Sequence, residues 1–404
     1  QAGDLETSGP LFDGAAVSII ERVNSNGTNG YGAFESVKIE GGSFSTTNTD
    51  GESAYGALHV SQYTNTTSGG YTDGFENKPD SGTQIVSISG GTFSSEVPAD
   101  YCAPGMVPST SGGTHTVTVD SSVATDGNGT EASPYIIRDV AQLEAFRDKV
   151  NSGASYEGVY FALVSGQTYD ISGSEWEPIG ISKWDADSQT FSHYPFKGHF
   201  DGNGATITGL TMTGDDLACY NSFNTGYACY GFFGGVDGGT VENLRFTSFN
   251  IDTPGTAIEN PEHGNACNNT VAVAVGAAVN GARISGITVE AGSVTGHSRT
   301  AGVVGFVGAD SNASPGGSVG NIVVEGCVNH AAVTSNWTYS SHGTAGGICA
   351  TYNTYSADSG SVTFQNNTNY GSITGFYAGG ILASTFAGDG DLILTGNSNY
   401  GAIC

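Results

Sequence analysis

Short stretches in which apolar and polar residues alternate occur along most of the chain. The segment Val37-Lys-Ile-Glu-Gly-Gly-Ser-Phe44 aligns with Val86-Ser-Ile-Ser-Gly-Gly-Thr-Phe93, and residues 16–20, Ala-Val-Ser-Ile-Ile, are a candidate third copy. Alternation with a period of two is typical of a strand that buries one face. Because the copies recur at intervals far longer than a hairpin needs, they predict successive coils of a solenoid.

One amphipathic helix is expected after these repeats. Asp139 can act as its N-cap, Gln142 completes a capping box three residues later, and Gly153 ends the helix. The apolar positions form a single stripe: Val140, Leu143, Phe146 and Val150. A solenoid has an open edge at each end, and a helix can cover that edge. We therefore interpret residues 135–152 as the N-terminal cap of a second module.

The rest of the sequence repeats a cassette of small and apolar residues. Its copies are Gly231-Phe-Phe-Gly234, Ala301-Gly-Val-Val-Gly305, Ala345-Gly-Gly-Ile348 and Ala378-Gly-Gly-Ile381. Each copy is followed by a turn and a strand, so that a unit holds three short strands. This count predicts the coil of a three-faced parallel β-helix, with Ile348 and Ile381 stacked on one inward-facing ladder. The preferred hand of crossover connections makes the helix right-handed.

The later copies of the repeat share a second sequence pattern, which begins with Asn. Two of them carry Asn369-Tyr-Gly-Ser-Ile-Thr374 and Asn399-Tyr-Gly-Ala-Ile-Cys404, and Asn329-His-Ala-Ala-Val-Thr334 has the same frame. Asn369 and Asn399 are expected to stack on neighbouring coils as an amide ladder, next to Tyr370 and Tyr400, because stacked amides and rings stabilise such geometry.

These patterns predict an all-β protein with two β-helical modules and one short capping helix. The first module covers residues 1–120, and the second covers residues 135–404. Between them, residues 121–134 are polar and contain Gly and Pro, which is typical of a linker.

Composition narrows the classes of function. The chain carries 39 acidic and 11 basic residues, for a net charge of −28, and has no Lys or Arg from residue 301 to 404. This argues against nucleic acid as a partner. No apolar run approaches the ~18 residues that a membrane span needs. An acidic, Lys-poor chain rich in Thr and Asn indicates an extracellular or cell-surface location.

The seven cysteines include no CxxC pair, so they do not indicate a structural zinc site. Cys219 and Cys229 are candidates for a local disulfide, and the alternative is two small buried hydrophobic residues. The odd count leaves Cys404 able to pair outside the sequence. We expect the chain to be part of a longer protein, because the last repeat lacks the dissimilar cap that natural solenoids use. The alternative is that another subunit covers this end.

Several blocks resemble a known family of repeat proteins. Phe196-Lys-Gly-His-Phe-Asp-Gly-Asn-Gly-Ala-Thr-Ile-Thr-Gly-Leu210, with Pro178-Ile-Gly180, Gly231-Phe-Phe-Gly234 and Val241-Glu-Asn-Leu244, is similar to GLUG-motif proteins. Those are pectin-lyase-like β-helix modules of large bacterial surface proteins. The segment Ile88-Ser-Gly-Gly-Thr-Phe93, with Tyr101-Cys-Ala-Pro-Gly105, resembles another β-helical repeat of surface proteins from gut bacteria. The resemblance implies a fold and a location, and it implies no catalytic residue.

Two kinds of enzyme are alternatives to the interpretation of the acidic motifs as polar turns. A polysaccharide lyase would need a calcium-binding carboxylate cluster and a basic residue, yet only Arg245, Arg283 and Arg299 lie beyond residue 200. A glycoside hydrolase would need closely placed carboxylates. Asn48-Thr-Asp-Gly51 and Asp215-Asp216 match pieces of that pattern but belong to different modules. We therefore assign no catalytic residue.

The sequence gives weaker signals for metal and ligand sites than for the fold. Two motifs have the alternating carboxylates of calcium loops but lack the terminal Glu: Asp185-Ala-Asp187 and Asp389-Gly-Asp391. We therefore favour surface turns over Ca²⁺ sites at both places. No cofactor is expected. His193, His199 and His263 show no ligand spacing. Some aromatic residues in loop-like segments are candidates for a ligand-binding surface, and the slightly favoured alternative is that they pack the loops against the solenoid. These residues are Trp176, Trp184, Tyr194, Tyr220, Tyr227, Trp337 and Tyr339.

The favoured function is a non-catalytic segment of a surface protein, acting as an adhesin or a rigid stalk that binds a glycan or a host-surface protein. One alternative is a carbohydrate-active β-helix enzyme. Three or more carboxylates converging in a groove with an Arg or Lys would favour it. The other alternative is a self-assembling filament or surface-layer subunit, in which the end coils dock on other copies of the chain.

Overall fold

A computed structural model describes residues 15–23, 36–46, 56–64, 70–73, 84–185, 190–213, 228–253, 269–309, 320–337, 343–354, 360–386 and 390–404. The chain divides into two compact units, Gln1–Asp120 and Ser121–Cys404, called unit 1 and unit 2 below. Within the described residues, strands dominate and no helix is long and apolar enough to cross a membrane.

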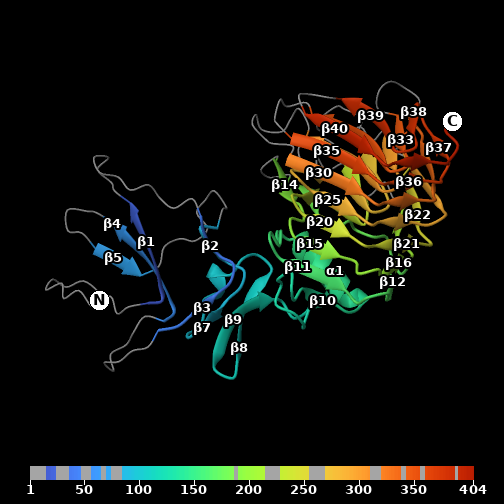
Figure 1. The fold of residues 1–404 in the computed structure, drawn as a ribbon. Helices are drawn as coiled ribbons and strands as arrows, with labels where there is room; N and C mark the ends of the chain where they lie inside the picture. Colours follow the sequence, from blue (N-terminus) through green and yellow to red (C-terminus); the bar gives the residue numbers. More distant parts are fainter. Residues whose placement is uncertain are drawn as a thin grey trace. The chain divides into compact units, whose positions relative to one another are not determined.

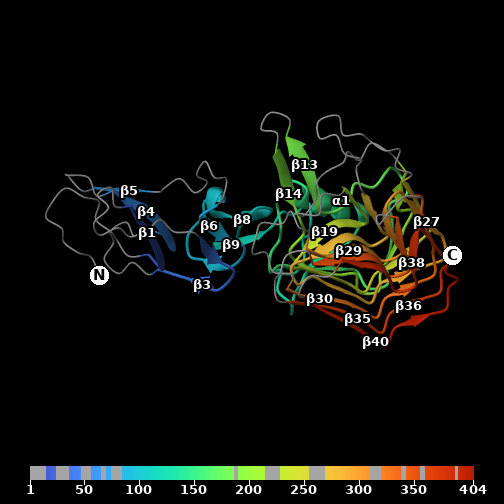
Figure 2. The same ribbon diagram turned by 90° about the horizontal axis from the view of Figure 1, so that it is seen from above.

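Unit 2 is a parallel β-helix whose strands form five parallel ladders (Figure 1). The first sheet is the longest and runs from one end of the unit to the other. Its strands are β10 (Tyr135–Ile137), β11 (Tyr160–Leu163), β15 (His199–Asp201), β20 (Thr240–Glu242), β25 (Arg283–Ser285), β30 (Gly320–Glu325), β35 (Gly360–Gln365) and β40 (Asp391–Thr395). In Figure 2, β30, β35 and β40 lie side by side along one edge of the unit.

Two further ladders follow along each coil. The second sheet holds β12 (Thr168–Asp170), β16 (Thr206–Thr208), β21 (Arg245–Thr247), β26 (Thr288–Val289), β31 (Val328–Asn329), β36 (Thr368–Asn369) and β41 (Ser398–Asn399). The third sheet holds β17 (Thr211–Met212), β22 (Asn250–Thr253), β27 (Ser293–Gly296), β32 (Ala332–Ser335) and β37 (Ile373–Thr374).

The last two ladders complete the coil. The fourth sheet holds β18 (Ala228–Tyr230), β23 (Asn269–Val271), β28 (Arg299–Ala301), β33 (Thr344–Gly346) and β38 (Tyr377–Gly379). The fifth sheet holds β19 (Phe233–Asp237), β24 (Val275–Val279), β29 (Val304–Ala309), β34 (Cys349–Thr354) and β39 (Leu382–Phe386). A separate antiparallel hairpin is formed by β13 (Ile181–Asp185) and β14 (Thr190–Tyr194).

A full coil therefore holds five short strands, and the expected count of three was wrong. The difference arises at the glycine cassettes, which are corners between the fourth and fifth sheets. In one cassette, β33 ends at Gly346 and β34 begins at Cys349. A Cβ atom on Gly346 would lie 1.9 Å from the Cys349 carbonyl oxygen, so only glycine fits this corner. The same frame repeats in the next coil, where a Cβ on Gly379 would lie 2.1 Å from the Leu382 carbonyl oxygen.

The parallel pairing and the inward ladder are confirmed. The backbone N–H of Cys349 donates to the Ile381 carbonyl over 2.8 Å, and that of Val304 donates to the Ile348 carbonyl over 2.8 Å. Ile348 is fully buried, and Ile381 occupies the same register position in the next coil. On the first sheet the inward positions are also apolar and buried: Phe161, Phe200, Val241, Ile284, Val324 and Phe364.

The corner between the first and second sheets requires a left-handed backbone in every later coil. Its first residue is Asn243, Gly286, Gly326, Asn366 or Gly396, with φ between 56° and 64°. Only Gly and, among the other residues, mainly Asn adopt this conformation at low cost. The N–H groups of the first four of these residues also bond to the next coil, for example Gly326 to the Gln365 carbonyl over 3.0 Å. The corner residue thus sets the register of each coil.

The helix α1 (Val140–Val150) covers the first coils of unit 2, as expected. The Asp139 carboxylate accepts from the Gln142 backbone N–H over 2.9 Å, and the Gln142 side chain accepts from the Arg138 N–H rather than from Asp139. Leu143, Phe146 and Val150 are buried, and Val140 is half-buried.

Phe146 is the centre of an aromatic cluster under α1. Its ring centroid lies 4.8 Å from that of Phe161, 5.6 Å from Phe196 and 5.5 Å from Phe200. These rings belong to successive turns of the chain, so the helix closes the apolar cross-section of the solenoid.

Residues 121–134, which the sequence indicates as a linker, are a packed part of unit 2. Val123 and Ala124 are buried, and the Asp126 carboxylate pairs with Arg138 over 2.6 Å. The Tyr160 N–H donates to the Gly129 carbonyl over 2.9 Å, which ties the segment to the first sheet. The composition of this segment is typical of a linker, and its few apolar residues are enough to pack it against the rest of unit 2.

Unit 1 contains two stacked coils followed by a hairpin. The first coil has β1 (Val17–Val23), β2 (Val37–Ile39) and β3 (Ser43–Phe44), which pair in parallel with β4 (Leu58–Thr64), β6 (Val86–Ile88) and β7 (Thr92–Phe93). Strand β5 (Gly70–Asp73) is antiparallel to β4. After the 3₁₀ turn at Ala99–Tyr101, β8 (Met106–Ser111) and β9 (Thr114–Val119) form an antiparallel hairpin next to β7.

The repeat that the sequence shows in unit 1 has the register expected from the alignment. Val37 pairs with Val86, and Phe44 pairs with Phe93, whose ring lies 5.1 Å away and is stacked on it. The candidate third copy at residues 16–20 was wrong. It falls in β1, which pairs with β4 in a different sheet, so it is an earlier strand of the same coil.

We predict that Phe146→Asp destabilises unit 2 by about 3–5 kcal/mol, because it places a charge in the apolar cross-section that α1 closes. Ala141→Asp is the matched control, since Ala141 is exposed on the same helix and its effect should stay within about 0.5 kcal/mol. Thermal and urea unfolding measure both. Equal stability of the two variants would show that α1 does not close the solenoid.

The corner conformation gives a second prediction. A Cβ on Gly326 would meet nothing closer than 3.9 Å, so a substitution there tests backbone strain alone. Gly326→Ala should reduce the free energy of unfolding by about 1–2 kcal/mol, and Gly326→Asn should cost less, because Asn tolerates positive φ. An Asn variant that is less stable than the Ala variant would contradict the left-handed corner.

Candidate functional site

Trp176, one of the aromatic candidates, is a core residue. Its side chain is 2% exposed, its ring is stacked on Phe232 at 5.1 Å, and its Nε1–H donates to the Phe232 carbonyl over 3.1 Å. The Arg147 guanidinium lies 4.8 Å from the ring centroid and covers it from the side of α1. A ring enclosed in this way cannot reach a ligand, so the expectation of a surface role for Trp176 was wrong.

The other aromatic candidates are distributed along the chain. Trp184 lies in β13, and the half-buried Tyr194 ends the partner strand β14. Trp337 follows β32, is half-buried, and packs edge-on against His297 at 4.6 Å. Tyr220, Tyr227 and Tyr339 lie outside the described residues. Trp176 and Tyr194 lie in the coil between β11 and β15, whereas Trp337 lies in a later coil between β30 and β35, so the three residues do not form one site.

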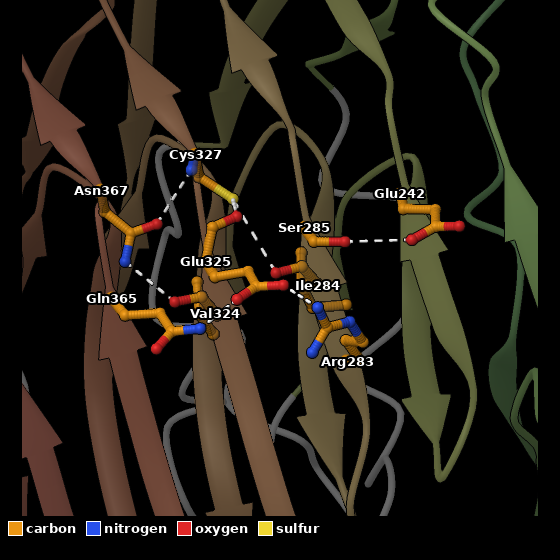
Figure 3. A network of polar contacts seen from close by, with 9 residues as sticks. All are labelled: Glu242, Arg283, Ile284, Ser285, Val324, Glu325, Cys327, Gln365 and Asn367. Carbon is orange, nitrogen blue, oxygen red and sulfur yellow. Dashed lines mark hydrogen bonds and ion pairs between the residues drawn. The ribbon is translucent and has the colours of Figure 1, made fainter.

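The outward face of the first sheet carries a row of polar side chains (Figure 3). Glu242, Ser285, Glu325 and Gln365 follow one another in register from β20 to β35. Ser285 Oγ donates to Glu242 Oε2 over 3.2 Å. Glu325 accepts from Gln365 Nε2 with one oxygen and pairs with the Arg283 guanidinium through the other. Both carboxylates therefore act as acceptors between coils.

This row does not have the form of a hydrolytic or lyase centre. The two carboxylates are separated by an intervening coil, so their backbones lie about 10 Å apart, twice the strand spacing. Of the three late arginines, Arg283 pairs with Glu325, Arg245 pairs with Glu290 over 2.8 Å, and Arg299 is 2% exposed. A base that abstracts a proton from a polysaccharide must reach it, and Arg299 is enclosed.

His199 also has a structural setting. Its ring is stacked on Tyr160 at 4.1 Å, and Nδ1 lies 3.0 Å from Thr240 Oγ1. Partial burial lowers the pKa of His199, while the nearby Glu242 and Glu131 act in the opposite direction. The ring is thus held as part of a cross-coil pair on the first sheet. His193 lies in β14, and His263 lies outside the described residues.

The described cysteines other than Cys404 are packed inside the fold. Cys327 is fully buried, which raises the pKa of its thiol to about 12, and burial raises that of Cys102 to about 11. Such thiols are not nucleophiles at neutral pH. Cys229 lies in β18 and packs against a cluster of Ala277, Val279 and Phe306. Cys219 lies outside the described residues, so its disulfide with Cys229 stays a prediction.

The acidic motifs weighed for Ca²⁺ or hydrolysis lie mostly outside the described residues. This holds for Asp187, Asp389 and Asp215-Asp216, and also for Asn48-Thr-Asp-Gly51. Asp201 is described, and its Oδ1 accepts from the Asn203 N–H over 2.7 Å and from Asn243 Nδ2 over 2.9 Å. Among the described residues, no group of three or more His, Cys, Asp or Glu side chains could hold a metal ion.

The expected amide ladder is present in the interior. Asn329 Nδ2 donates to Asn369 Oδ1 over 2.8 Å, and Asn369 Nδ2 donates to Asn399 Oδ1 over 2.7 Å. Each Nδ2 also donates to the carbonyl two residues later in its own coil, at 2.9–3.0 Å. The ladder therefore holds each coil in register with its neighbour and also stabilises the turn within each coil.

A second amide ladder, two residues earlier, was not predicted. Asn367 Oδ1 accepts from the Cys327 N–H over 2.9 Å, and its Nδ2 donates to the Val324 carbonyl over 2.9 Å, as Figure 3 shows. Asn397 Oδ1 in turn accepts from the Asn367 N–H over 3.0 Å. The sequence signal was available, because Asn367 and Asn397 occupy the same place in the two Asn-Tyr-Gly copies.

The rings next to the amide ladder form an exposed stack, called the aromatic file below: His330, Tyr370 and Tyr400. The ring centroids of His330 and Tyr370 lie 4.8 Å apart with planes at 4°, and those of Tyr370 and Tyr400 lie 5.2 Å apart at 15°. The sequence indicated the two tyrosines. It also placed His330 in the same frame, but the ring stack across three coils was not recognised.

Comparisons with known proteins give a partial match. No family model matches the chain. A protein of Evansella cellulosilytica named "Putative Gly-rich membrane protein" is 33% identical over 143 residues, which are 34% of this chain and 13% of that protein. A solved structure described as a "putative immunoglobulin A1 protease" from Bacteroides ovatus is similar over 70% of each chain, with a TM-score of 0.47 and 19% identity. Neither similarity assigns an activity to this chain.

The buried amide ladder gives a testable prediction. Asn369→Ala removes a partner from both Asn329 and Asn399, and an unsatisfied buried polar group costs about 1–3 kcal/mol. We expect a loss of at least about 2 kcal/mol in the free energy of unfolding. Asn399→Ala is the control, because Asn399 is exposed and bonds to one amide of the ladder, that of Asn369. Equal losses in the two variants, measured by urea unfolding, would contradict the role of the ladder.

Proposed function

We propose that this chain is a non-catalytic segment of an extracellular or cell-surface protein, acting as a rigid stalk or adhesive element. The observation that carries the proposal is the use of the outward polar groups on the first sheet. Glu242 bonds to Ser285, and Glu325 bonds to Arg283 and Gln365. These groups connect one coil to the next, and such connections stiffen the solenoid along its axis.

Continuous internal bonding supports a mechanical role. The first sheet runs through eight strands without a break, and the amide ladders add side-chain bonds between coils inside the fold. A surface location agrees with the acidic, Lys-poor composition and with the similarity to a protein named as a membrane protein. The chain spans 13% of that relative, so the proposal concerns this segment and its immediate ligands.

The two alternatives are less well supported. A carbohydrate-active enzyme needs carboxylates that are free to exchange protons, whereas Glu325 is held by two partners. A filament built by stacking unit 2 head to tail would require the coil under α1 to accept another copy. Phe146 and its aromatic neighbours fill that end, so α1 would have to be displaced.

The proposal predicts that the purified chain releases no oligosaccharides from a panel of neutral and acidic polysaccharides, as measured by reducing ends and by mass spectrometry. Glu325→Gln keeps the shape and hydrogen-bonding capacity of the side chain but removes its charge. Cleavage by the wild-type chain that is abolished in Glu325→Gln would overturn the proposal in favour of an enzyme.

A further inference from the structure

The aromatic file is exposed along its side, although its rings cover one another. Tyr370 has a neighbouring ring on both faces and is still 50% exposed, and Tyr400 is 69% exposed. Centroid separations of 4.8 and 5.2 Å are those of offset-stacked rings. Each ring therefore leaves an outer edge, part of one face and, in the tyrosines, a hydroxyl group open to the solvent.

A strip of small hydroxyl side chains follows the file along the same coil. In the third sheet, Ile373 points inward and is buried, whereas Ser372 and Thr374 are exposed on either side of it. Thr374 is in register with Thr334 of the preceding coil, so the hydroxyl groups repeat along the solenoid.

The aromatic pair that comes next along the chain does not belong to this surface. Tyr377 is in register with Arg299 and Thr344, which are buried in the preceding coils. The exposure of Tyr377 therefore reflects its place in the last described strand of the fourth sheet. We call the aromatic file together with Ser372 and Thr374 the aromatic–hydroxyl face.

The charge of this part of the chain limits the chemistry of a partner. Residues 301–404 contain no Lys or Arg, and their acidic residues are few: Asp310, Glu325, Asp358, Asp389 and Asp391. Glu325 is already engaged by Arg283 and Gln365 on the first sheet. None of the residues that define the aromatic–hydroxyl face is acidic, and neither Lys nor Arg is present to bind a carboxylate, sulfate or phosphate.

We propose that the aromatic–hydroxyl face binds a neutral glycan. This inference rests on the proposed non-catalytic adhesive function and names its ligand and its site. Pyranose rings have apolar C–H faces that pack against aromatic rings, and their hydroxyl groups bond to Ser, Thr and Tyr hydroxyls. Both kinds of group adjoin each other here. The ring stack and the hydroxyl groups of Thr334 and Thr374 also repeat from coil to coil at the strand spacing of about 4.8 Å. An extended glycan lying along the solenoid therefore meets equivalent groups on successive coils.

The chain supplies a matched control for the aromatic file. Tyr160 and His199 form a stacked Tyr–His pair on the first sheet, with ring centroids 4.1 Å apart. This pair has the chemistry of His330 and Tyr370 but lies outside the aromatic–hydroxyl face. Tyr160→Ala therefore removes a Tyr–His stack elsewhere on the solenoid, whereas Tyr370→Ala removes a ring stacked on His330 and Tyr400 within the face.

The experiment uses the full chain on an array of neutral and acidic glycans, followed by titration calorimetry with the best neutral oligosaccharide. We expect binding to neutral glycans, a dissociation constant raised at least about tenfold in Tyr370→Ala, and an unchanged constant in Tyr160→Ala. Thermal unfolding checks that both variants fold. A host glycoprotein that retains the chain after enzymatic removal of its glycans would indicate a protein ligand and overturn the proposal.

Other outcomes separate this inference from the proposed function. Equal affinity of Tyr370→Ala and the wild type would refute the site and leave a non-catalytic adhesive role intact. Binding restricted to acidic glycans, or no binding to any neutral glycan on the array, would refute the ligand class. Cleavage of the bound glycan would refute the non-catalytic function while the location of the site could still hold.

Discussion

The alignment of each coil on the one before it is the constraint on which the rest of this structure depends. Backbone hydrogen bonds join equivalent strands in parallel, so residues at the same place in the repeat lie about 4.8 Å apart. The corners enforce this register. Gly326 adopts a left-handed backbone, and Gly346 leaves no room for a Cβ atom. A shift of one residue would turn every inward side chain outward.

The same alignment decides which side chains the surface can carry. Like charges on neighbouring coils repel each other, so the outward row on the first sheet separates Glu242 from Glu325 with Ser285. Amides and aromatic rings stack without this penalty, and Asn369 and Tyr370 occupy such positions. A repeat protein of this kind favours uncharged polar groups, in agreement with a charged fraction of only 12%.

Much of the fold follows from the sequence because repeats encode register directly. The alignment of residues 37–44 with 86–93 predicted the pairing of Phe44 with Phe93, and the apolar stripe predicted the packing of Phe146. Five strands per coil were not predicted, because a two-residue strand has no alternation to detect. Trp176 was a candidate for a ligand-binding surface because it falls in a loop-like segment. Its burial depends on Phe232, which is 56 positions away in the sequence. The pattern of residues along the sequence does not reveal side-chain contacts between residues that lie far apart in the chain.

Disulfide trapping between coils tests the register most directly. In a Cys404→Ser background, which removes the exposed thiol, His330→Cys combined with Tyr370→Cys places two thiols on adjacent strands at a spacing that a disulfide can bridge. His330→Cys with Ser372→Cys displaces one thiol by two residues along the coil. The in-register account predicts rapid oxidation of the first pair and little of the second. Faster oxidation of the displaced pair would contradict the alignment of the coils and the surfaces that depend on it.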